Sequence, residues 1–229
     1  MSQHHRSVPI PFPPVSQMPD WGPVYVGGDL SANNLFNAYS RGIFPWPSGP
    51  DAPMEWHCPN PSAILFFEDM HVPKSLKREA RARRGQYRFS VDEAFAEVIS
   101  GCREVERGPY NQSWIFQDVI DAYLRLHKRG LAHSVEVWEG DELIGGLYGV
   151  TVGNVFTGES MFHRRANASK LAILYLVEVL QAQGLNWIDI QVMTPHFERL
   201  GAVHISRTWF LRLLTWTQKQ SIQLFADQA

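Results

Sequence analysis

Cysteine is scarce in this chain, which contains only Cys58 and Cys102 among its 229 residues. Two cysteines cannot build a disulfide framework, and no set of cysteines and histidines has the spacing of a metal site. Such usage is typical of proteins in a reducing compartment. We therefore expect a cytoplasmic location, no structural disulfide and no bound metal.

Long apolar runs are missing as well. Residues 1–22, MSQHHRSVPIPFPPVSQMPDWG, lack the continuous apolar core of an export signal. The most apolar helical candidate, LAILYLVEVL, is short and contains Glu178, whereas a helix that crosses a bilayer needs about 20 apolar residues. We expect neither an export signal nor a membrane partner.

An excess of one sign of charge is the third absence. The net charge is −2 at pH 7, and 45% of the residues are hydrophobic while 19% are charged, which is typical of an ordinary globular protein. The chain as a whole supplies no positive field. A polyanionic partner would therefore have to be held by a local basic patch.

Prolines are concentrated in the N-terminal part of the chain. Residues 43–61, IFPWPSGPDAPMEWHCPNP, contain six prolines, which remove backbone donors and predict a long irregular loop. Loops of this length are often functional. One short helix is predicted before the loop, with Asp29 or Ser31 as its N-cap and Gly42 as its stop.

The composition changes near residue 65. A strand predicted over residues 63–67 follows the proline-rich segment, and regular alternation of helices and strands begins after it. We place a domain boundary there. The expected division is a small N-terminal domain, residues 1–65, and a larger domain, residues 66–229.

The larger part has a clear order of elements. A strand at residues 87–91 precedes a helix, and Ser90 with Glu93 forms a capping box before that helix. The helix has apolar residues spaced i, i+3, i+4, i+7, namely Phe95, Val98, Ile99 and Cys102. A second helix, three strands joined by hairpin turns, a third helix, a strand, a short helix and a final strand and helix follow. The first six of these are predicted at residues 116–129, 132–138, 143–152, 155–162, 168–183 and 187–192.

This order predicts an α/β (α+β) fold with a mixed, mostly antiparallel sheet and one crossover into a parallel strand. It resembles the N-acetyltransferase-like (GNAT-like) fold, in which diverging central strands open a cleft for the donor. In that class a glycine-rich turn holds the pyrophosphate of coenzyme A at a helix N-terminus. The corresponding segment here, MFHRRANASK, has no glycine. A coenzyme A-dependent N-acetyltransferase is therefore the alternative, not the preferred interpretation.

Two polar residues interrupt an otherwise apolar strand candidate, WIDIQV. Side chains of a strand alternate between its faces, so Asp189 and Gln191 are expected on one face, with Ile188 and Ile190 on the other. A strand whose polar face meets water would give the same pattern. The functional interpretation is that both polar groups point into one cleft.

Eight segments distributed over the chain are similar to those of the leucyl/phenylalanyl-tRNA-protein transferase family. RGIFPW, GESMF and D-x-Q are specific when they occur together. The eight segments occur in the family's order: GGDLS (27–31), AYSRGIFPW (38–46), HSVEVW (133–138), GGLYGV (145–150), GESMF (158–162), NASK (167–170), DIQV (189–192) and LGA (200–202).

The resemblance implies an enzyme that moves leucine or phenylalanine, and methionine more weakly, from aminoacyl-tRNA to proteins that begin with arginine or lysine. The modified proteins would then enter N-degron proteolysis. Aminolysis of the tRNA ester is downhill, so no ATP, metal or other cofactor is expected. What remains is positioning, deprotonation of the amine and stabilisation of the oxyanion. We expect a monomer.

The resemblance also implies three catalytic residues, Asp189, Gln191 and Glu159. Gln191 would hold the attacking amine while Asp189 orients it, because an amide is too weak a base to take the proton. Glu159 would bind the cationic side chain or amino group of the acceptor. A strand-end glutamate paired with a nearby base is the alternative. The final proton acceptor stays open, with the ribose hydroxyl of the donor as one candidate.

The donor needs an apolar pocket for its side chain and a flat surface for its terminal adenosine. We expect Leu147, Met161, Ile173 and Leu176 to line the pocket, and Trp46 and Trp114 to stack on the adenine. Ordinary core packing would explain the same residues.

One segment supplies the local basic patch. Residues 74–84, KSLKREARARR, contain six basic residues and one acidic residue. The candidates for contact with tRNA phosphates are Lys74, Lys77, Arg78, Arg81 and Arg84, the first four of which form one stripe on a helix. A solvated helix face is the usual alternative. A non-catalytic tRNA-binding protein is the second rival function, and the three catalytic candidates disfavour it.

Overall fold

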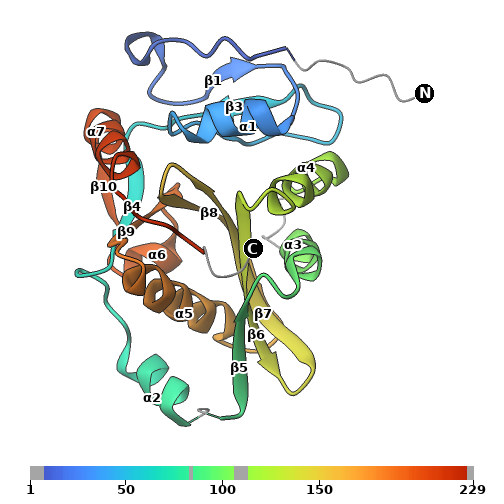
Figure 1. Ribbon diagram of the computed structural model, residues 1–229, viewed down its shortest axis with the longest axis vertical. Helices are drawn as coiled ribbons and strands as arrows, with labels where there is room; N and C mark the ends of the chain where they lie inside the picture. The colour runs from blue at the N-terminus through green and yellow to red at the C-terminus, as the bar shows by residue number, and fades with distance from the viewer. Residues whose placement is uncertain (1–7, 83–84, 106–112, 226–229) are drawn as a thin grey trace.

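The computed structural model describes residues 8–82, 85–105 and 113–225 (Figure 1). The described helices are α1 (Ala32–Tyr39), α2 (Lys74–Ala82), α3 (Phe95–Glu104), α4 (Gln117–His127), α5 (Ala168–Ala182), α6 (Pro195–Arg199) and α7 (Arg207–Gln218), with a 3-10 turn, η1 (Val15–Gln17). The described strands are β1 (Pro23–Val26), β2 (Phe44–Pro45), β3 (Glu55–His57), β4 (Ser62–Phe66), β5 (Tyr87–Val91), β6 (Ala132–Glu139), β7 (Glu142–Val152), β8 (Val155–His163), β9 (Trp187–Gln191) and β10 (Val203–Ile205). Over these ranges, no helix combines the length and apolar character that a bilayer crossing needs.

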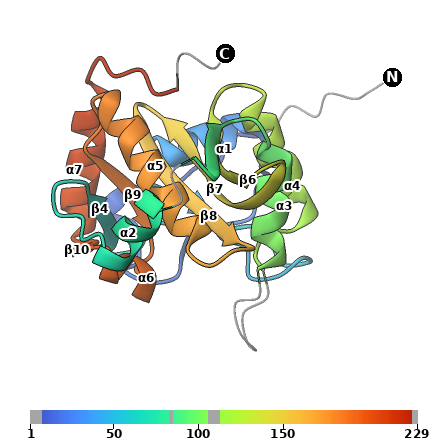
Figure 2. The ribbon, with the colours of Figure 1, turned by 90° about the horizontal axis from the view of Figure 1, so that it is seen from below.

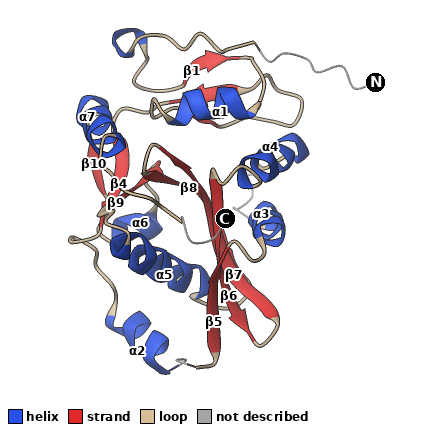
Figure 3. Ribbon diagram, in the orientation of Figure 1, coloured by secondary structure: helices blue, strands red, loops and turns tan. Residues whose placement is uncertain are grey.

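The strands form a small sheet at one end of the molecule and a large curved sheet through its middle (Figure 3). The small sheet has the order β1-β3-β2, and the large one the order β10-β4-β9-β8-β7-β6-β5. Neighbours in the large sheet are antiparallel, except that β8 and β9 are parallel. Helices α3 and α4 cover one face of this sheet, and α5 covers the other (Figures 1 and 3). The predicted mixed α/β fold and its order of elements are confirmed.

The proline-rich segment is more regular than predicted. Strands β2 and β3 both lie within residues 43–61 and join β1 in the small sheet. Proline is tolerated because Pro45 lies on β2, an edge strand, whereas the central strand β3 contains no proline. The prediction of an unbroken irregular loop is therefore wrong. Ahead of this segment, Ser31 is the N-cap of α1, and its hydroxyl accepts a hydrogen bond from the Asn34 N–H at 3.3 Å.

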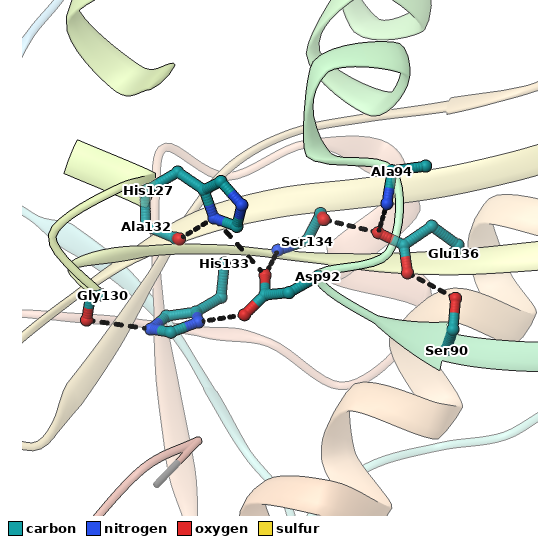
Figure 4. Close-up of polar contacts among 9 residues, drawn as sticks. All are labelled: Ser90, Asp92, Ala94, His127, Gly130, Ala132, His133, Ser134 and Glu136. Atoms are coloured by element: carbon teal, nitrogen blue, oxygen red, sulfur yellow. Dashed lines mark hydrogen bonds and ion pairs between the residues drawn. The ribbon is translucent and has the colours of Figure 1, made fainter. Parts of the chain in front are cut away.

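The first turn of α3 is capped from a neighbouring strand (Figure 4). The predicted capping box is wrong, because the Ser90 hydroxyl donates to Glu136 at 2.6 Å and Glu93 pairs with Arg88. Glu136 is fully buried on β6, and its other oxygen accepts the Ala94 N–H at 3.4 Å. A carboxylate at this position also interacts favourably with the helix dipole. The predicted apolar stripe of α3 is buried.

The end of α4 is tied to the same region by polar contacts (Figure 4). Nδ1 of His127, the last residue of α4, lies 2.8 Å from the Ala132 carbonyl and 3.7 Å from the Asp92 carboxylate. The same carboxylate lies 2.6 Å from Nδ1 of His133 on β6. These contacts hold α4, which carries Tyr123, in place beside the large sheet.

Helix α5 begins against β7 at a position where glycine leaves room. A Cβ atom on Gly145 would lie 2.6 Å from the Cβ of Ala168, the first residue of α5. A larger residue would therefore push the helix away from the sheet. Because Gly145 is paired with His163, this contact places the start of α5 beside the end of β8.

The N-terminal part is joined to the rest of the chain at β4. This strand begins at Ser62 and lies between β9 and β10 in the large sheet. We propose that residues 1–65 and 66–229 are two domains, which meet within β4.

Arg207 on α7 holds two N-terminal segments against the C-terminal helix. Its Nε donates to the Cys58 carbonyl at 2.9 Å, and its Nη1 to the Met18 carbonyl at 3.1 Å. Its Nη2 donates to the Pro19 carbonyl. Arg207 is only 5% exposed, so these carbonyls depend on its guanidinium for their hydrogen bonds.

Replacing Arg207 by methionine should lower the free energy of unfolding by about 3 kcal/mol, because several buried carbonyls would lose their donor. Urea denaturation measures the change. Arg212→Met, at an exposed position of the same helix, is the matched control and should stay within about 0.5 kcal/mol. Equal midpoints for the two variants would contradict the structural role of Arg207.

Candidate active site

A cavity of about 520 Å³ opens where β8 and β9 separate. The two strands are paired at Thr157 and Asp189, and β8 continues from there to His163. Side chains of β8, β9, α5 and α6 line it. Residues 44–46, Val105, Trp114 and two residues of β7, Leu147 and Tyr148, are also part of the lining. The cavity therefore lies between the large sheet and the N-terminal part, as expected for diverging strands.

Glu159 of β8 is the centre of a hydrogen-bond cluster at this cavity. Its Oε1 accepts from the Tyr39 hydroxyl at 2.7 Å and from Nε2 of Gln191 at 2.6 Å. Its Oε2 lies 3.1 Å from the Tyr123 hydroxyl. The two tyrosine hydroxyls lie 2.5 Å apart, and both side chains are buried. Helices α1 and α4 and strands β8 and β9 each supply one member of the cluster.

The oxygen atoms of Glu159, Tyr39 and Tyr123 form three mutual contacts, and each contact needs one hydrogen. The two tyrosines supply two hydrogens, so an ionised Glu159 would leave one pair of oxygens in contact without a hydrogen between them. A protonated Glu159 completes the ring: it donates to Tyr123, Tyr123 donates to Tyr39, and Tyr39 donates back to Glu159. The geometry therefore favours a neutral Glu159.

Burial raises the pKa of both carboxyl groups of the site, Glu159 and Asp189. Desolvation raises the pKa of Glu159 to about 8, although hydrogen bonds from Tyr39 and Tyr123 lower it, and the charge of Asp189 adds to the rise. Burial likewise raises the pKa of Asp189 to about 7, against hydrogen bonds from Gln191 and Thr157. Groups with a pKa in this range can exchange protons near neutral pH.

Gln191 ends β9 with its backbone turned out of the strand conformation, at a φ of +64°. The Asp189 carboxylate stabilises this turn, because its Oδ1 accepts the Gln191 N–H at 2.8 Å. Ile188, Ile190 and Gln191 all line the cavity. Asp189 does not line it and is 4% exposed. The expectation that both polar side chains share one face and point into the cleft is therefore wrong, because the alternation of the strand ends at Gln191.

The four residues expected around the donor side chain lie together in the cavity. Leu147 and Met161 are paired across β7 and β8, while Ile173 and Leu176 belong to the buried face of α5. Ile188 and Ile190 extend the same apolar surface. That the four residues bind leucine or phenylalanine stays a prediction.

Both tryptophans expected to contact the adenosine also line the cavity. Trp46 is 40% exposed, and its ring meets His57 edge-on with the ring centres 5.6 Å apart. Trp114 is half-buried against a core cluster that includes residues of α1, α3 and α4. Neither ring is fully enclosed, so both can offer surface to a flat ligand. Their stacking role stays a prediction.

The basic helix is present as α2, and Leu76 is its one buried residue. The exposed side chains of α2 include Lys74, Lys77, Arg78 and Arg81. Glu79 of the same helix accepts a hydrogen bond from Asn167 at 2.7 Å. This contact places α2 beside the end of α5 that lines the cavity (Figure 2). Arg84 lies outside the described residues, and the tRNA contacts stay a prediction.

No sequence pattern singles out Tyr39 or Tyr123 as functional residues. Both lie in helical segments where an aromatic residue is ordinary core material, and Tyr39 belongs to the AYSRGIFPW segment. A buried tyrosine needs a partner for its hydroxyl, but nothing in the sequence indicates that both share Glu159. Within the described ranges, no group of three or more side chains could hold a metal ion.

Two family models match the chain. The model described as leucyl/phenylalanyl-tRNA protein transferase matches residues 64–215, and the model described as the N-terminal domain of that transferase matches residues 28–60.

Curated proteins named leucyl/phenylalanyl-tRNA-protein transferase match over most of their length. The one from Pseudoalteromonas atlantica is 44% identical over 99% of this chain and 94% of its own. That from Lawsonia intracellularis is 43% identical over 90% of both, and that from Anaeromyxobacter sp. (strain K) 46% over 94% and 90%. Among solved structures, a GCN5-related N-acetyltransferase from Kribbella flavida matches with a TM-score of 0.37 and 12% identity, over 72% of this chain and 57% of that one.

The raised pKa of Glu159 has a consequence for stability. Between the usual pKa of 4.5 and the folded value of about 8, the folded protein keeps a proton that the unfolded chain has released. The contribution of Glu159 to stability is therefore present at pH 5 and is lost as the pH rises through 8. Urea midpoints of the unaltered protein should fall more steeply over this range than those of Glu159→Gln. Glu97→Gln, at an exposed position, should keep the steep slope, and equal slopes for all three proteins would mean that Glu159 is ionised at pH 5.

Proposed function

The chain belongs to the leucyl/phenylalanyl-tRNA-protein transferase family, a family of aminoacyltransferases, and we propose that it transfers leucine or phenylalanine, and methionine more weakly, from aminoacyl-tRNA to proteins that begin with arginine or lysine. Transfer to the α-amino group would mark these acceptors for N-degron proteolysis. We further propose that the protein acts as a monomer in the cytoplasm and uses no cofactor.

One observation carries the proposal: an acid and an amide meet at an apolar cavity. Gln191 donates to Glu159 at 2.6 Å through its amide nitrogen, which leaves its carbonyl oxygen available to an incoming amine. Asp189 stabilises the backbone turn at Gln191, because its carboxylate accepts the Gln191 N–H. In this arrangement Gln191 touches the acceptor, and Asp189 is a positioning residue.

Glu159 is the proposed acceptor of the first proton that the amine loses. The α-ammonium group has a pKa of about 8, close to the raised pKa of Glu159. Binding of a cationic acceptor favours ionised Glu159, whose own proton passes to solvent. The carboxylate then takes one proton from the ammonium group to leave a neutral amine. The amine attacks the ester carbon, the bond to the ribose oxygen breaks, and the second proton passes to that oxygen.

The donor is accommodated by the rest of the cavity. Leu147, Met161 and the two isoleucines of β9 offer an apolar surface without a polar partner, which suits an aliphatic or aromatic side chain and rejects a charged one. The flexible thioether of Met161 can adapt to both shapes. Trp46 and Trp114 supply flat surfaces for the adenine. The basic side chains of α2 attract further phosphates of the tRNA strand.

Aminoacyl transfer tests the proposal directly. The purified protein should move radiolabelled leucine and phenylalanine from charged tRNA to a peptide that begins with arginine, without ATP or a metal ion. Gln191→Ala should lower the rate at least about 100-fold, because the amine loses its positioning group. Transfer of acetyl groups from acetyl-CoA to the same peptide, with no transfer of leucine, would instead support the acetyltransferase alternative.

Recognition of the acceptor is tested at Glu159. Peptides that begin with arginine should be preferred over peptides that begin with alanine, and Glu159→Gln should reduce this preference by about 10- to 100-fold, since the carboxylate can also pair with the arginine side chain and glutamine loses that charge-assisted hydrogen bond. Glu142→Gln, at an exposed end of β7, is the control. An unchanged ratio of kcat/KM values in Glu159→Gln would remove Glu159 from acceptor recognition.

A further inference from the structure

Two backbone N–H groups in the first turn of α5 lack an acceptor among the described residues. Its N-cap, Asn167, has a φ of +65° and makes no capping hydrogen bond with its own helix. The Asn167 side chain donates to Glu79 at 2.7 Å and accepts from the Lys170 ammonium at 2.8 Å instead. Among the described residues, the N–H groups of Ser169 and Lys170 find no backbone or side-chain acceptor. Both N–H groups belong to a helix end, where the dipole favours an anion.

A polar side chain at the same place also lacks a partner. Ser169 is 6% exposed and lines the cavity, and its hydroxyl makes no hydrogen bond to any described residue. His196, on α6, lines the cavity too, and its Nε2 is buried without a partner among the described residues. Buried polar groups are normally hydrogen-bonded. These two side chains can therefore hydrogen-bond a polar ligand at this end of the cavity.

The charges at this end are positive. Lys170 and His163 line the cavity, and Arg199 is close enough to His196 to affect its titration. Burial lowers the pKa of His196 to about 4, and the neighbouring Lys170 and Arg199 charges add to the effect, so that this ring is a neutral donor or acceptor. Among the described residues, Glu159 is the one carboxylate that lines the cavity. It lies four strand residues from His163, about 13 Å along β8.

We propose that the first turn of α5, with Ser169, Lys170 and His196, is an anion subsite that binds the phosphate on the 5′ side of the donor's terminal adenosine. The inference rests on the proposed function. Free N–H groups at a helix start, a hydroxyl and an ammonium group are together the usual partners of a phosphate. The separation of Glu159 and His163 along β8 lets the nucleotide lie along the cavity. Its ester would then be near Glu159 and its phosphate near the start of α5. The Asn167 contact to α2 joins this subsite to the basic stripe, where the next phosphates of the same strand would lie.

Two non-transferable donor analogues test the subsite. The probe is 3′-phenylalanylamido-3′-deoxyadenosine, in which an amide replaces the ester, prepared with and without a 5′-phosphate. Titration calorimetry should show that the phosphate strengthens binding to the unaltered protein by about 10- to 100-fold. Ser169→Asp should abolish this gain, because a carboxylate stabilises the first turn of a helix but repels a phosphate. Ser169→Asn introduces a side chain of the same size as aspartate but without the charge, and this variant should keep most of the gain in affinity from the phosphate. Thermal unfolding of both variants controls for folding.

The outcomes separate this inference from the proposed function. If the phosphate adds no affinity while the unphosphorylated analogue still binds, the subsite is wrong and the donor cavity stands. If neither analogue binds, the proposed function itself fails. If acetyl-CoA binds and Ser169→Asp abolishes that binding, the anion site belongs to a coenzyme and the tRNA assignment is overturned. Lys170→Gln gives a second test, with an expected loss of most of the phosphate gain, whereas Lys219→Gln, at the C-cap of α7, should change nothing.

Discussion

A carboxyl group without a cationic partner among the described residues is the constraint on which the site depends. Glu159 is held at an apolar cavity by two phenols and one amide, and such surroundings stabilise its neutral form. In the proposed reaction, the positive N-terminus of the acceptor would make ionisation of this acid favourable. A carboxylate paired permanently with an arginine could not respond in this way, because its charge would already be compensated.

The same constraint explains why the N-terminal part is packed against the large sheet. Tyr39 comes from α1 and Tyr123 from α4, so that neither half of the chain can complete the cluster alone. The capping of α3 by Glu136 and the contacts at the end of α4 keep Tyr123 in place, and the contact of Gly145 with Ala168 sets the position of α5. Packing contacts outside the Glu159 cluster therefore determine the positions of the residues around the cavity.

Much of the fold could be predicted from the sequence, because periodicity and turn residues are local signals. The apolar stripe of α3, the meander of β6, β7 and β8, and the crossover through α5 all follow from such signals. The failures arise where side-chain contacts and backbone turns override the local pattern. Ser90 lies in β5 and its hydroxyl bonds to Glu136, while α3 begins only at Phe95. Gln191 would share the face of Asp189, away from the cavity, if its backbone kept the strand conformation.

Only part of the site could be predicted from the sequence. The resemblance to a family indicates Glu159, Gln191 and the cavity-lining residues, which the structure brings together. It does not indicate the roles of Tyr39, Ser169 or His196, because a phenol, a hydroxyl and an imidazole acquire meaning only from what surrounds them.

The placement of β4 between β9 and β10, and the grip of Arg207 on the segments around Met18 and Cys58, matter while the protein is being made. A ribosome releases the chain from its N-terminus, so β4 emerges long before either neighbour strand exists. Until α7 leaves the exit tunnel, the early segments have unpaired strand edges and bare carbonyls. Synthesis that stops before the last helix would release a product with open edges, which invites aggregation and digestion.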